Sequence, residues 1–291
     1  MLKLGMKQVL VTGSNGFIGR KLTEKLRQKN IEVSEFSRKN NRDVTKKEDL
    51  AALPKTDTVF HLAAVSGYKD CDENTNPAYE VNVNGTVNVL EYCRRVGAKL
   101  IFPSTYVYDQ PYEEVKTETS ACKPTTHYSF TKFLGEELCC FYTRVLKVNS
   151  LILRTGNVYG FGQEDKYLVP LIFNHILNNQ ALTLTKPEIE RSFIYIDDLV
   201  EAYIRLAEAQ TEPGEVFNVG PEKPTTLQEL IETIGRVSAK TPLVSYEGKE
   251  RPKEVSLNRV DISKMKNKLN WQPEISLEAG LKLYLEAGNH L

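Results

Sequence analysis

A tyrosine and a lysine four residues apart, Tyr128 and Lys132, stand in the segment HYSFTKFLGEE at residues 127–137. The surrounding pattern predicts a helix, and positions i and i+4 of a helix lie on one face within reach of each other. A lysine ammonium beside a phenol favours the phenolate, so this pair could act as acid and base toward a hydroxyl or carbonyl group. The same spacing also fits a half-buried tyrosine that packs on a lysine stem. The rest of the chain has to decide between the two interpretations.

Three glycines follow the first predicted strand in VLVTGSNGFIGRKL. They stand between a strand and a helix, where glycine allows a tight turn and the close approach of a pyrophosphate to the backbone. The free N–H groups at the start of the helix add the positive end of its dipole. A plain strand-to-helix turn rarely needs three glycines, so we predict a dinucleotide site. Its expected contacts from this turn are Gly13, Asn15, Gly16, Phe17, Ile18 and Gly19.

The end of the second predicted strand, in EVSEFSRKNN, bears on the choice between NAD and NADP. Ser37 and Arg38 stand where an NAD site normally offers a carboxylate to the ribose 2′-hydroxyl. Arg38, helped by Lys39, is suited to pair with a 2′-phosphate, so the segment favours NADP. If the strand ends earlier, Glu35 would supply the carboxylate of an NAD site, so NAD stays an alternative. The segment SRKNN could instead be a solvated loop. Asp43 is a candidate to bind the adenine edge or to cap the next helix.

The composition is that of a globular protein without a broad charged surface. Of 291 residues, 41% are hydrophobic and 26% are charged. The 38 basic side chains balance 38 acidic ones, which argues against nucleic acid or an anionic membrane as a partner. Five cysteines without a C-x-x-C pair, and only four histidines, argue against a disulfide framework and a zinc site. We expect a cytoplasmic protein without a metal, whose N-terminal segment enters a strand rather than a signal peptide or membrane span.

Short apolar runs alternate with helical stretches through the first half of the chain, from QVLVTG to NSLILRTG. This alternation predicts an α/β fold, a parallel sheet wound with helices on both faces. After about residue 160 the pattern changes to loops and shorter elements with proline and glycine. We therefore expect a dinucleotide-binding domain at residues 1–160, with a return of the chain at about 188–210, and a smaller C-terminal α/β substrate lobe at residues 161–291.

Taken together, the motifs of this chain resemble those of the extended short-chain dehydrogenases, the NAD(P)-dependent nucleotide-sugar epimerases, dehydratases and reductases. The resemblance spans nearly the whole chain and implies a doubly wound Rossmann-type sheet and a catalytic tyrosine–lysine pair. Besides the glycine turn and that pair, it rests on HLAA at 61–64, NVNGT at 82–86, PSTYVYD at 103–109, LRTGNVYGFG at 153–162, RSFIYIDDLVEA at 191–202, FNVG at 217–220 and DISKMKNKLNWQP at 261–273.

The resemblance also implies roles for single residues. Tyr128 would be the acid and base at the sugar oxygen, and Lys132 would lower its pKa and hold the nicotinamide ribose. Ser104, with Thr105 as second choice, would hydrogen-bond the same oxygen. His61 is expected to fix local backbone. The further cofactor contacts would be Ser37, Arg38, Asp43, Val44, Leu62, Ala63, Ala64 and Asn82. The substrate contacts would be Ser66, Ser104, Thr105, Asn157, Val169, Arg191 and Arg251, although a helix cap or surface ion pairs would also explain Asn157 and the two arginines.

Departures from the family pattern narrow the reaction. Thr105 and Tyr106 stand where dehydratases carry an Asp-Glu pair, which argues against 4,6-dehydration. Tyr106 also occupies the position of the extra cysteine in reductases that epimerise C3 or C5. We expect NADPH-dependent reduction of a 4-keto nucleotide sugar, with an NAD-dependent 4-epimerase of the UDP-glucose type as the alternative and a non-catalytic cofactor-sensing protein as a third interpretation. The resemblance further implies a two-fold homodimer formed through the two long helices at residues 78–96 and 129–146.

Overall fold

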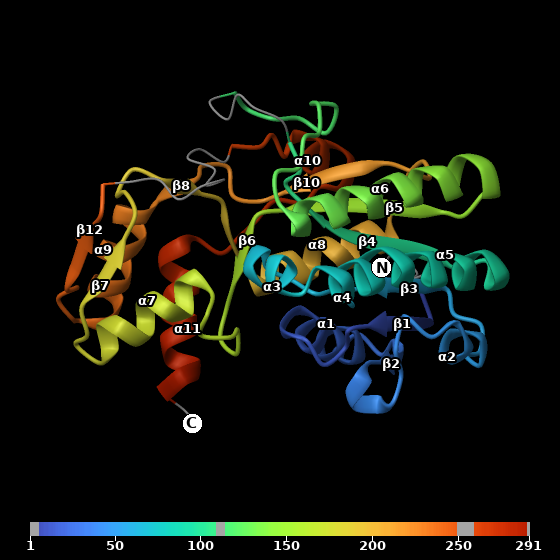
Figure 1. Cartoon of the computed structure of the whole chain (residues 1–291), viewed down its shortest axis with the longest axis horizontal. Helices are drawn as coiled ribbons and strands as arrows, with labels where there is room; N and C mark the ends of the chain where they lie inside the picture. Colours follow the sequence, from blue (N-terminus) through green and yellow to red (C-terminus); the bar gives the residue numbers. More distant parts are fainter. Residues whose placement is uncertain (1–5, 109–113, 249–258, 290–291) are drawn as a thin grey trace.

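The computed structural model describes residues 6–108, 114–248 and 259–289. Its centre is a parallel sheet with the strand order β10-β5-β4-β3-β1-β2 (Figure 1). All five strand pairings are parallel, so the chain crosses from one strand to the next through the covering helices. The predicted doubly wound Rossmann-type sheet is confirmed. The strands are β1 (Gln8–Thr12), β2 (Glu32–Phe36), β3 (Thr58–His61), β4 (Lys99–Thr105), β5 (Ser150–Thr155) and β10 (Val216–Val219).

Side chains that alternate along the strands build a core on each face of the sheet. Val9 and Val11 of β1 pack in one core with Leu22 and Leu26, while Leu10 belongs to the other core. The first core lies under α1 and α8, and the second under α5 and α6. These four helices are α1 (Phe17–Gln28), α5 (Gly85–Val96), α6 (His127–Leu146) and α8 (Ile196–Glu208).

Short elements connect β2 to α5 at the edge of the sheet. A 3-10 turn follows β2, and a π-helical turn links α4 to α5, so the long helix expected at residues 78–96 is interrupted at its start. These elements are η1 (Arg38–Asn40), α2 (Lys47–Ala51), α3 (Tyr68–Glu73), α4 (Thr75–Tyr79) and the π-helix η2 (Glu80–Asn84).

A second lobe stands beside the sheet (Figure 1). Its helix α7 and the sheet helices α1 and α8 contribute to one continuous core, so the two parts pack together. Two strand pairs, β6 with β9 and β8 with β11, lie where the chain passes between lobe and sheet. The elements are β6 (Asn157–Tyr159), α7 (Leu168–Leu177), β7 (Leu182–Leu184), β8 (Glu190–Arg191), β9 (Phe193–Tyr195), β11 (Thr225–Thr226), α9 (Leu227–Ser238), β12 (Val244–Tyr246) and α11 (Leu277–Asn289).

Besides the expected return at 188–210, two further elements from residues 161–291 belong to the sheet side. Strand β10 pairs with β5 as the sixth strand, and α10 (Ser263–Leu269) packs on β10. Helix α8 lies within the expected return at 188–210 and covers the sheet. The chain therefore crosses between sheet and lobe more often than a single return requires.

Candidate active site

Tyr128 and Lys132 lie on the first two turns of α6. Thr126 caps this helix, because its side chain accepts a hydrogen bond from the Ser129 backbone N–H. In return, the Ser129 hydroxyl oxygen accepts a hydrogen bond from the Thr126 backbone N–H. Lys132 Nζ donates to the Pro103 carbonyl of β4 at 2.8 Å and lies 5.0 Å from the centre of the Phe102 ring. The lysine therefore joins the tyrosine helix to the carboxyl end of β4.

Burial acts on both members of the pair. It lowers the pKa of Lys132 to about 8, since a charged ammonium is disfavoured away from water. Burial also raises the pKa of Tyr128, and Tyr167 and Cys71 add to this rise. Lys132 is not among the causes of this rise, and its ammonium bonds the Pro103 carbonyl, so a lowering of the Tyr128 pKa by Lys132 stays a prediction.

Ser104 supplies a buried hydroxyl next to Pro103. The residue is 3% exposed, and its Oγ has no hydrogen-bond partner within the described segments. A buried hydroxyl without a partner costs free energy unless a bound group satisfies it. Thr105, the second choice from the sequence, donates to the Thr155 carbonyl at 3.5 Å. Ser104 is thus the better placed of the two to bond an oxygen of a ligand.

The glycine turn has the geometry that a dinucleotide phosphate requires. Gly13 has φ +68°, and a Cβ there would lie 2.7 Å from the Ala63 N and the Leu62 carbonyl carbon. A Cβ at Gly19 would collide with the Gly13 carbonyl oxygen, so glycine is also needed for the packing of α1 on the turn. The turn thus lies against Leu62 and Ala63, two of the predicted cofactor contacts, and its residues fit a bound NAD or NADP.

His61 lies at the end of β3 and supports the glycine turn through hydrogen bonds. Its Nδ1 lies 2.8 Å from Thr12 Oγ1 and its Nε2 lies 3.0 Å from Thr86 Oγ1. Because Thr86 donates to the Asn82 carbonyl, it accepts from Nε2–H, and Thr12 donates to Nδ1. Burial, with Lys132 nearby, lowers the pKa of His61 to about 3. The imidazole is therefore neutral, and Thr12 also accepts from the Ala63 N–H at 3.2 Å.

Asn82 supports the neighbouring loop from the π-helical turn. Its Oδ1 accepts from the Val65 N–H at 2.8 Å, and its Nδ2 donates to the Val65 carbonyl at 3.0 Å. The same Nδ2 donates to Thr131 Oγ1 at 2.9 Å, one residue before Lys132. Asn82 thus joins the loop after β3 to the catalytic helix, and its contact with a cofactor stays a prediction.

The structure brings Asn15, Ser37, Arg38 and Asp43 together at the end of β2. Strand β2 ends at Phe36, so Ser37 is the first residue after it, and Asn15 Nδ2 donates to Ser37 Oγ at 2.5 Å. Arg38 Nε donates to Asp43 Oδ2 at 2.9 Å, with 70% of the arginine side chain exposed. The two residues predicted to bind the cofactor are therefore paired with each other.

Other predicted cofactor residues differ in exposure. Asp43 Oδ1 also accepts from the N–H and hydroxyl of Thr45; although burial opposes them, these bonds and Arg38 lower the pKa of Asp43. Val44 is buried in the core beneath Gly85, while Phe17 and Ile18 are partly buried at the start of α1. Ala64 is partly exposed after β3. The side chain of Val44 thus serves packing.

The predicted substrate contacts are spread along the junction of sheet and lobe. Ser66 Oγ lies 2.9 Å from the Tyr167 hydroxyl, and Asn157 is exposed on β6, where its N–H bonds the Ser192 carbonyl. Arg191 is partly exposed on β8, and Arg251 lies outside the described residues. Val169 is 2% exposed and its side chain packs in the core, so only its backbone in the first turn of α7 is left for a ligand.

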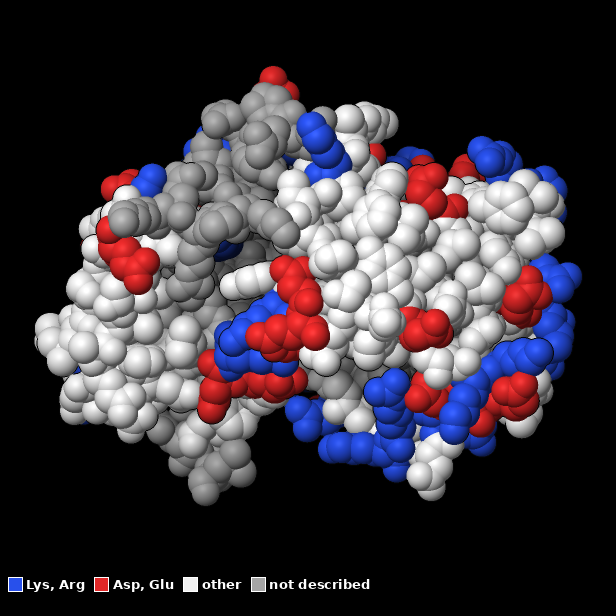
Figure 2. Space-filling view, in the orientation of Figure 1, with Lys and Arg blue, Asp and Glu red and all other residues white. Residues whose placement is uncertain are grey.

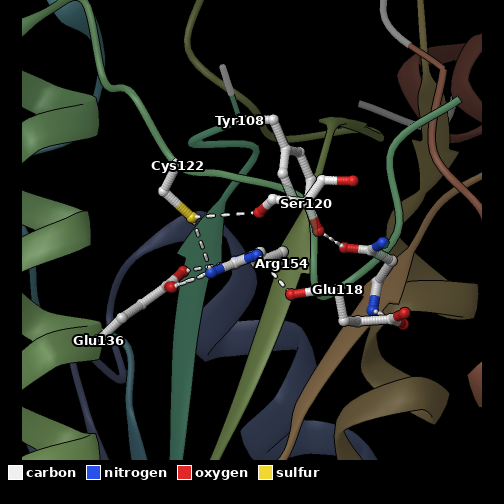
Figure 3. A network of polar contacts seen from close by, with 7 residues as sticks. Tyr108, Glu118, Ser120, Cys122, Glu136 and Arg154 are labelled. Carbon is white, nitrogen blue, oxygen red and sulfur yellow. Dashed lines mark hydrogen bonds and ion pairs between the residues drawn. The ribbon is translucent and has the colours of Figure 1, made fainter. Parts of the chain in front are cut away.

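A buried ion pair that the sequence analysis did not single out fixes α6 one turn beyond Lys132. Arg154 of β5 donates to Glu136 at 2.9 Å from Nε and 2.5 Å from Nη2, and both side chains are at most 5% exposed. Figure 3 shows Arg154 between Glu136 and Cys122, with Tyr108 close by. The guanidinium lies 3.2 Å from Cys122 Sγ and 4.8 Å from the centre of the Tyr108 ring. An arginine within the apolar strand SLILRT was the available signal.

The described segments lack two kinds of feature. They contain no group of three or more histidine, cysteine, aspartate or glutamate residues placed to hold a metal ion. Within the same segments, no helix combines the length and the apolar character needed to cross a membrane.

Comparisons with known proteins connect this geometry to a family. The sequence pattern of the NAD dependent epimerase/dehydratase family matches residues 9–220. A UDP-glucuronic acid decarboxylase of Arabidopsis thaliana is 32% identical over 96% of this chain and 88% of its own length. The crystal structure of UDP-glucose 4-epimerase from Thermotoga maritima with UDP-glucose is similar, with a TM-score of 0.90, 27% identity and coverage of 97% of this chain and 99% of that one. The Thermus thermophilus UDP-glucose 4-epimerase in complex with NAD has a TM-score of 0.87 at 26% identity, covering 96% and 98%.

Proposed function

The chain belongs to the NAD dependent epimerase/dehydratase family, and from that premise we propose that it oxidises and reduces the C4 position of a UDP-sugar as a 4-epimerase. The observation that carries the proposal is the assembly of Tyr128, Lys132 and the unpartnered hydroxyl of Ser104 at the carboxyl end of β4. Parallel sheets of this kind bind ligands at that end. The nucleotide and the sugar position come from the named ligands and activities of the relatives.

In the proposed reaction Tyr128 takes the proton from the C4 hydroxyl and later returns it. Ser104 donates a hydrogen bond to the same oxygen and keeps it in line with the phenol. A dinucleotide held by the glycine turn would supply the hydride acceptor and a positive charge, and the same hydride would return to the opposite face of C4, which inverts that centre. Lowering a phenol pKa from near 10 to near 7 takes about 4 kcal/mol, and burial of Tyr128 adds to this requirement. Lys132 therefore serves the reaction as a charge that stabilises the phenolate.

The contact between Arg38 and Asp43 favours NAD over the NADP that Ser37 and Arg38 indicate in the sequence. The carboxylate neutralises the arginine, so the pair offers no net positive charge to a 2′-phosphate. Asp43→Asn would free the guanidinium, and we expect it to tighten NADPH binding about tenfold while NADH binding stays within about threefold. Glu48→Gln, which changes an exposed carboxylate on α2, is the control. Equal affinities of wild type and Asp43→Asn for NADPH in a fluorescence titration would contradict this cofactor assignment.

NADPH-dependent reduction of a 4-keto nucleotide sugar is the second candidate. The absence of a carboxylate at Ser37, directly after β2, favours it. In this reaction Tyr128 protonates the new alkoxide, and the cofactor must exchange at every turnover. Arg38→Ala would then weaken NADPH binding about tenfold and leave NADH binding almost unchanged.

The nicotinamide absorbance of the purified protein distinguishes the two candidates. A 4-epimerase retains its dinucleotide and converts UDP-glucose to its 4-epimer without a net change in the nicotinamide absorbance. NMR of the products detects the epimer. Stoichiometric oxidation of NADPH by a 4-keto UDP-sugar, with no epimer formed from UDP-glucose, would replace the first candidate by the second. All five cysteines are free thiols, which supports the further proposal that the protein works in the reducing cytoplasm.

A further inference from the structure

Two hydroxyl groups meet across the junction between the sheet and the lobe. Ser66, in the loop that follows β3, comes from the sheet side, and Tyr167, the residue that precedes α7, comes from the lobe. Their oxygens lie 2.9 Å apart, although 101 residues separate them in the chain. Ser66 is exposed and Tyr167 is half-buried, so a ligand can reach this hydrogen bond.

The backbone and a charged cluster hold this corner in place. Gly67 has φ +92°, and a Cβ on it would lie 4.0 Å from the Tyr167 hydroxyl. Lys166 Nζ bonds Asp70 Oδ2 at 2.6 Å and Glu164 Oε2 at 3.0 Å. Figure 2 shows acidic and basic side chains gathered over α3, where the surface is hollowed between sheet and lobe. One positive charge thus stands between two negative ones.

The corner is connected to the helix that carries the reacting phenol. After burial, Tyr167 is the largest influence on the pKa of Tyr128 and raises it, so the two phenols lie within electrostatic reach. Asn82 holds Val65, the neighbour of Ser66, against α6 through Thr131. The two hydroxyls are therefore fixed relative to the helix that carries Tyr128.

We propose that Ser66 and Tyr167 bind the sugar of the substrate and make Tyr167 a specificity-determining residue that selects a neutral hexose over a hexuronic acid. This inference rests on the proposed function and names its substrate class. Two hydroxyls can each donate to and accept from a sugar hydroxyl, exchanging their mutual bond for bonds to the ligand. The carboxylate of a uronic acid would instead meet the net negative cluster of Asp70, Glu164 and Lys166.

Calorimetric titration of the full chain, saturated with NAD, with UDP, UDP-glucose and UDP-glucuronic acid tests the proposal. We expect the wild type to bind UDP-glucose about tenfold more tightly than UDP-glucuronic acid. Tyr167→Phe, which removes only the hydroxyl, should weaken UDP-glucose about tenfold and leave UDP within about twofold, since UDP lacks the sugar. Ser66→Ala should likewise weaken UDP-glucose and leave UDP almost unchanged. The binding free energy for UDP-glucose lost in the double variant should be less than the sum of the losses in the two single variants. Tyr246→Phe removes a phenol hydroxyl of the same lobe on β12 and should change neither affinity.

Three results would overturn the inference. One is an unchanged affinity of both Tyr167→Phe and Ser66→Ala for UDP-glucose. Another is an equal loss of affinity for UDP and for UDP-glucose in these variants, which would mean that the pair only connects the sheet side to the lobe. The third is a wild type that prefers UDP-glucuronic acid. A wild type that binds neither UDP nor either UDP-sugar would instead refute the proposed function, and this is visible before any variant is made. Thermal melting of each variant shows that it is folded, and Ser66→Ala tests the same bond if Tyr167→Phe does not fold.

Discussion

Burial shifts the pKa of three titratable side chains around the reacting centre. It lowers the pKa of Lys132 to about 8 and that of His61 to about 3, and it raises the pKa of Tyr128. In every case the uncharged form is favoured, because desolvation penalises charge. A bound cofactor and substrate must therefore enter a site in which charges are costly and each added charge has a large effect.

Replacing the reacting phenol tests the assignment of Tyr128. We expect Tyr128→Phe to reduce turnover at least about a hundredfold and to leave cofactor affinity within a few fold, because it removes the proton donor and little binding surface. Steady-state kinetics and a cofactor titration measure the two quantities. Tyr79→Phe, which removes a phenol hydroxyl on α4 beside His127 at the start of α6, should retain turnover. Near-normal turnover of Tyr128→Phe would remove the assignment.

The neutral state of His61 makes the protein sensitive to acid. Its pKa is about 3 in the folded protein against 6.5 for an ordinary histidine, so between these values the unfolded chain binds a proton that the folded protein does not. The free energy of unfolding should fall as the pH falls through this window, by up to about 1.4 kcal/mol per pH unit from this group.

Urea denaturation of the wild type and His61→Gln at several pH values from 7.5 to 4.5 measures this contribution. Glutamine can hydrogen-bond Thr12 and Thr86 but takes up no proton. We expect the variant to be less stable at pH 7.5 and to lose stability more slowly on acidification. Parallel curves for the two proteins would mean that His61 does not carry the effect.

Helix α6 is the element that unites the site. A Cβ on Gly135 would collide with the Phe102 ring, so glycine lets the helix approach β4 closely enough for Lys132 to reach Pro103. One turn further, Glu136 pairs with Arg154 of β5. Tyr128, Lys132 and Glu136 follow each other at intervals of four, so one face of one helix carries both the chemistry and its anchor.

Breaking the anchor should destabilise the fold far more than a change beside it. Glu136→Gln leaves the Arg154 guanidinium buried without a carboxylate, and we expect a loss of about 3 kcal/mol in the free energy of unfolding. Glu137→Gln changes the exposed neighbour on the same helix and should stay within about 0.5 kcal/mol of the wild type. Chemical denaturation compares the two; equal stabilities would show that the ion pair does not hold α6.

At the scale of the molecule, the outer side of α6 presents apolar residues to solvent. Phe130, Phe141 and Val145 are 40%, 47% and 50% exposed. Helix α5 packs beside α6, joined by the bond of the Tyr142 hydroxyl to Glu91 at 2.9 Å. Helix α6 has an uncovered apolar side and lies beside α5, and such a surface is suited to pair with a symmetry mate, so we propose the two-fold homodimer expected from the resemblance.

Light scattering at micromolar concentration tests the dimer. We expect twice the mass of the 33.0 kDa chain, and a shift toward the monomer in Phe141→Glu, which places a charge in the centre of the contact. Leu243→Glu is the matched control, since Leu243 is equally exposed in the lobe at 52%. A monomer mass for the wild type would remove the proposal.

The sequence by itself determined the features that depend on neighbours in the chain. The glycine turn, the alternation of strands and helices, and the shared face of Tyr128 and Lys132 follow from backbone sterics and periods of 2 and 3.6 residues, which act over a few positions. The Rossmann-type sheet was predicted on this basis and is confirmed.

Only the tertiary structure decided what comes together from distant segments. The four residues of β10 are too short to signal a place in the central sheet, and parallel pairing with β5 is reached through a long crossover. The contact between Ser66 and Tyr167, the ion pair of Glu136 and Arg154, and the rise in the Tyr128 pKa likewise depend on packing and burial. Burial is a property of the whole core, so no local pattern around Tyr128 could predict that desolvation raises the pKa of the phenol.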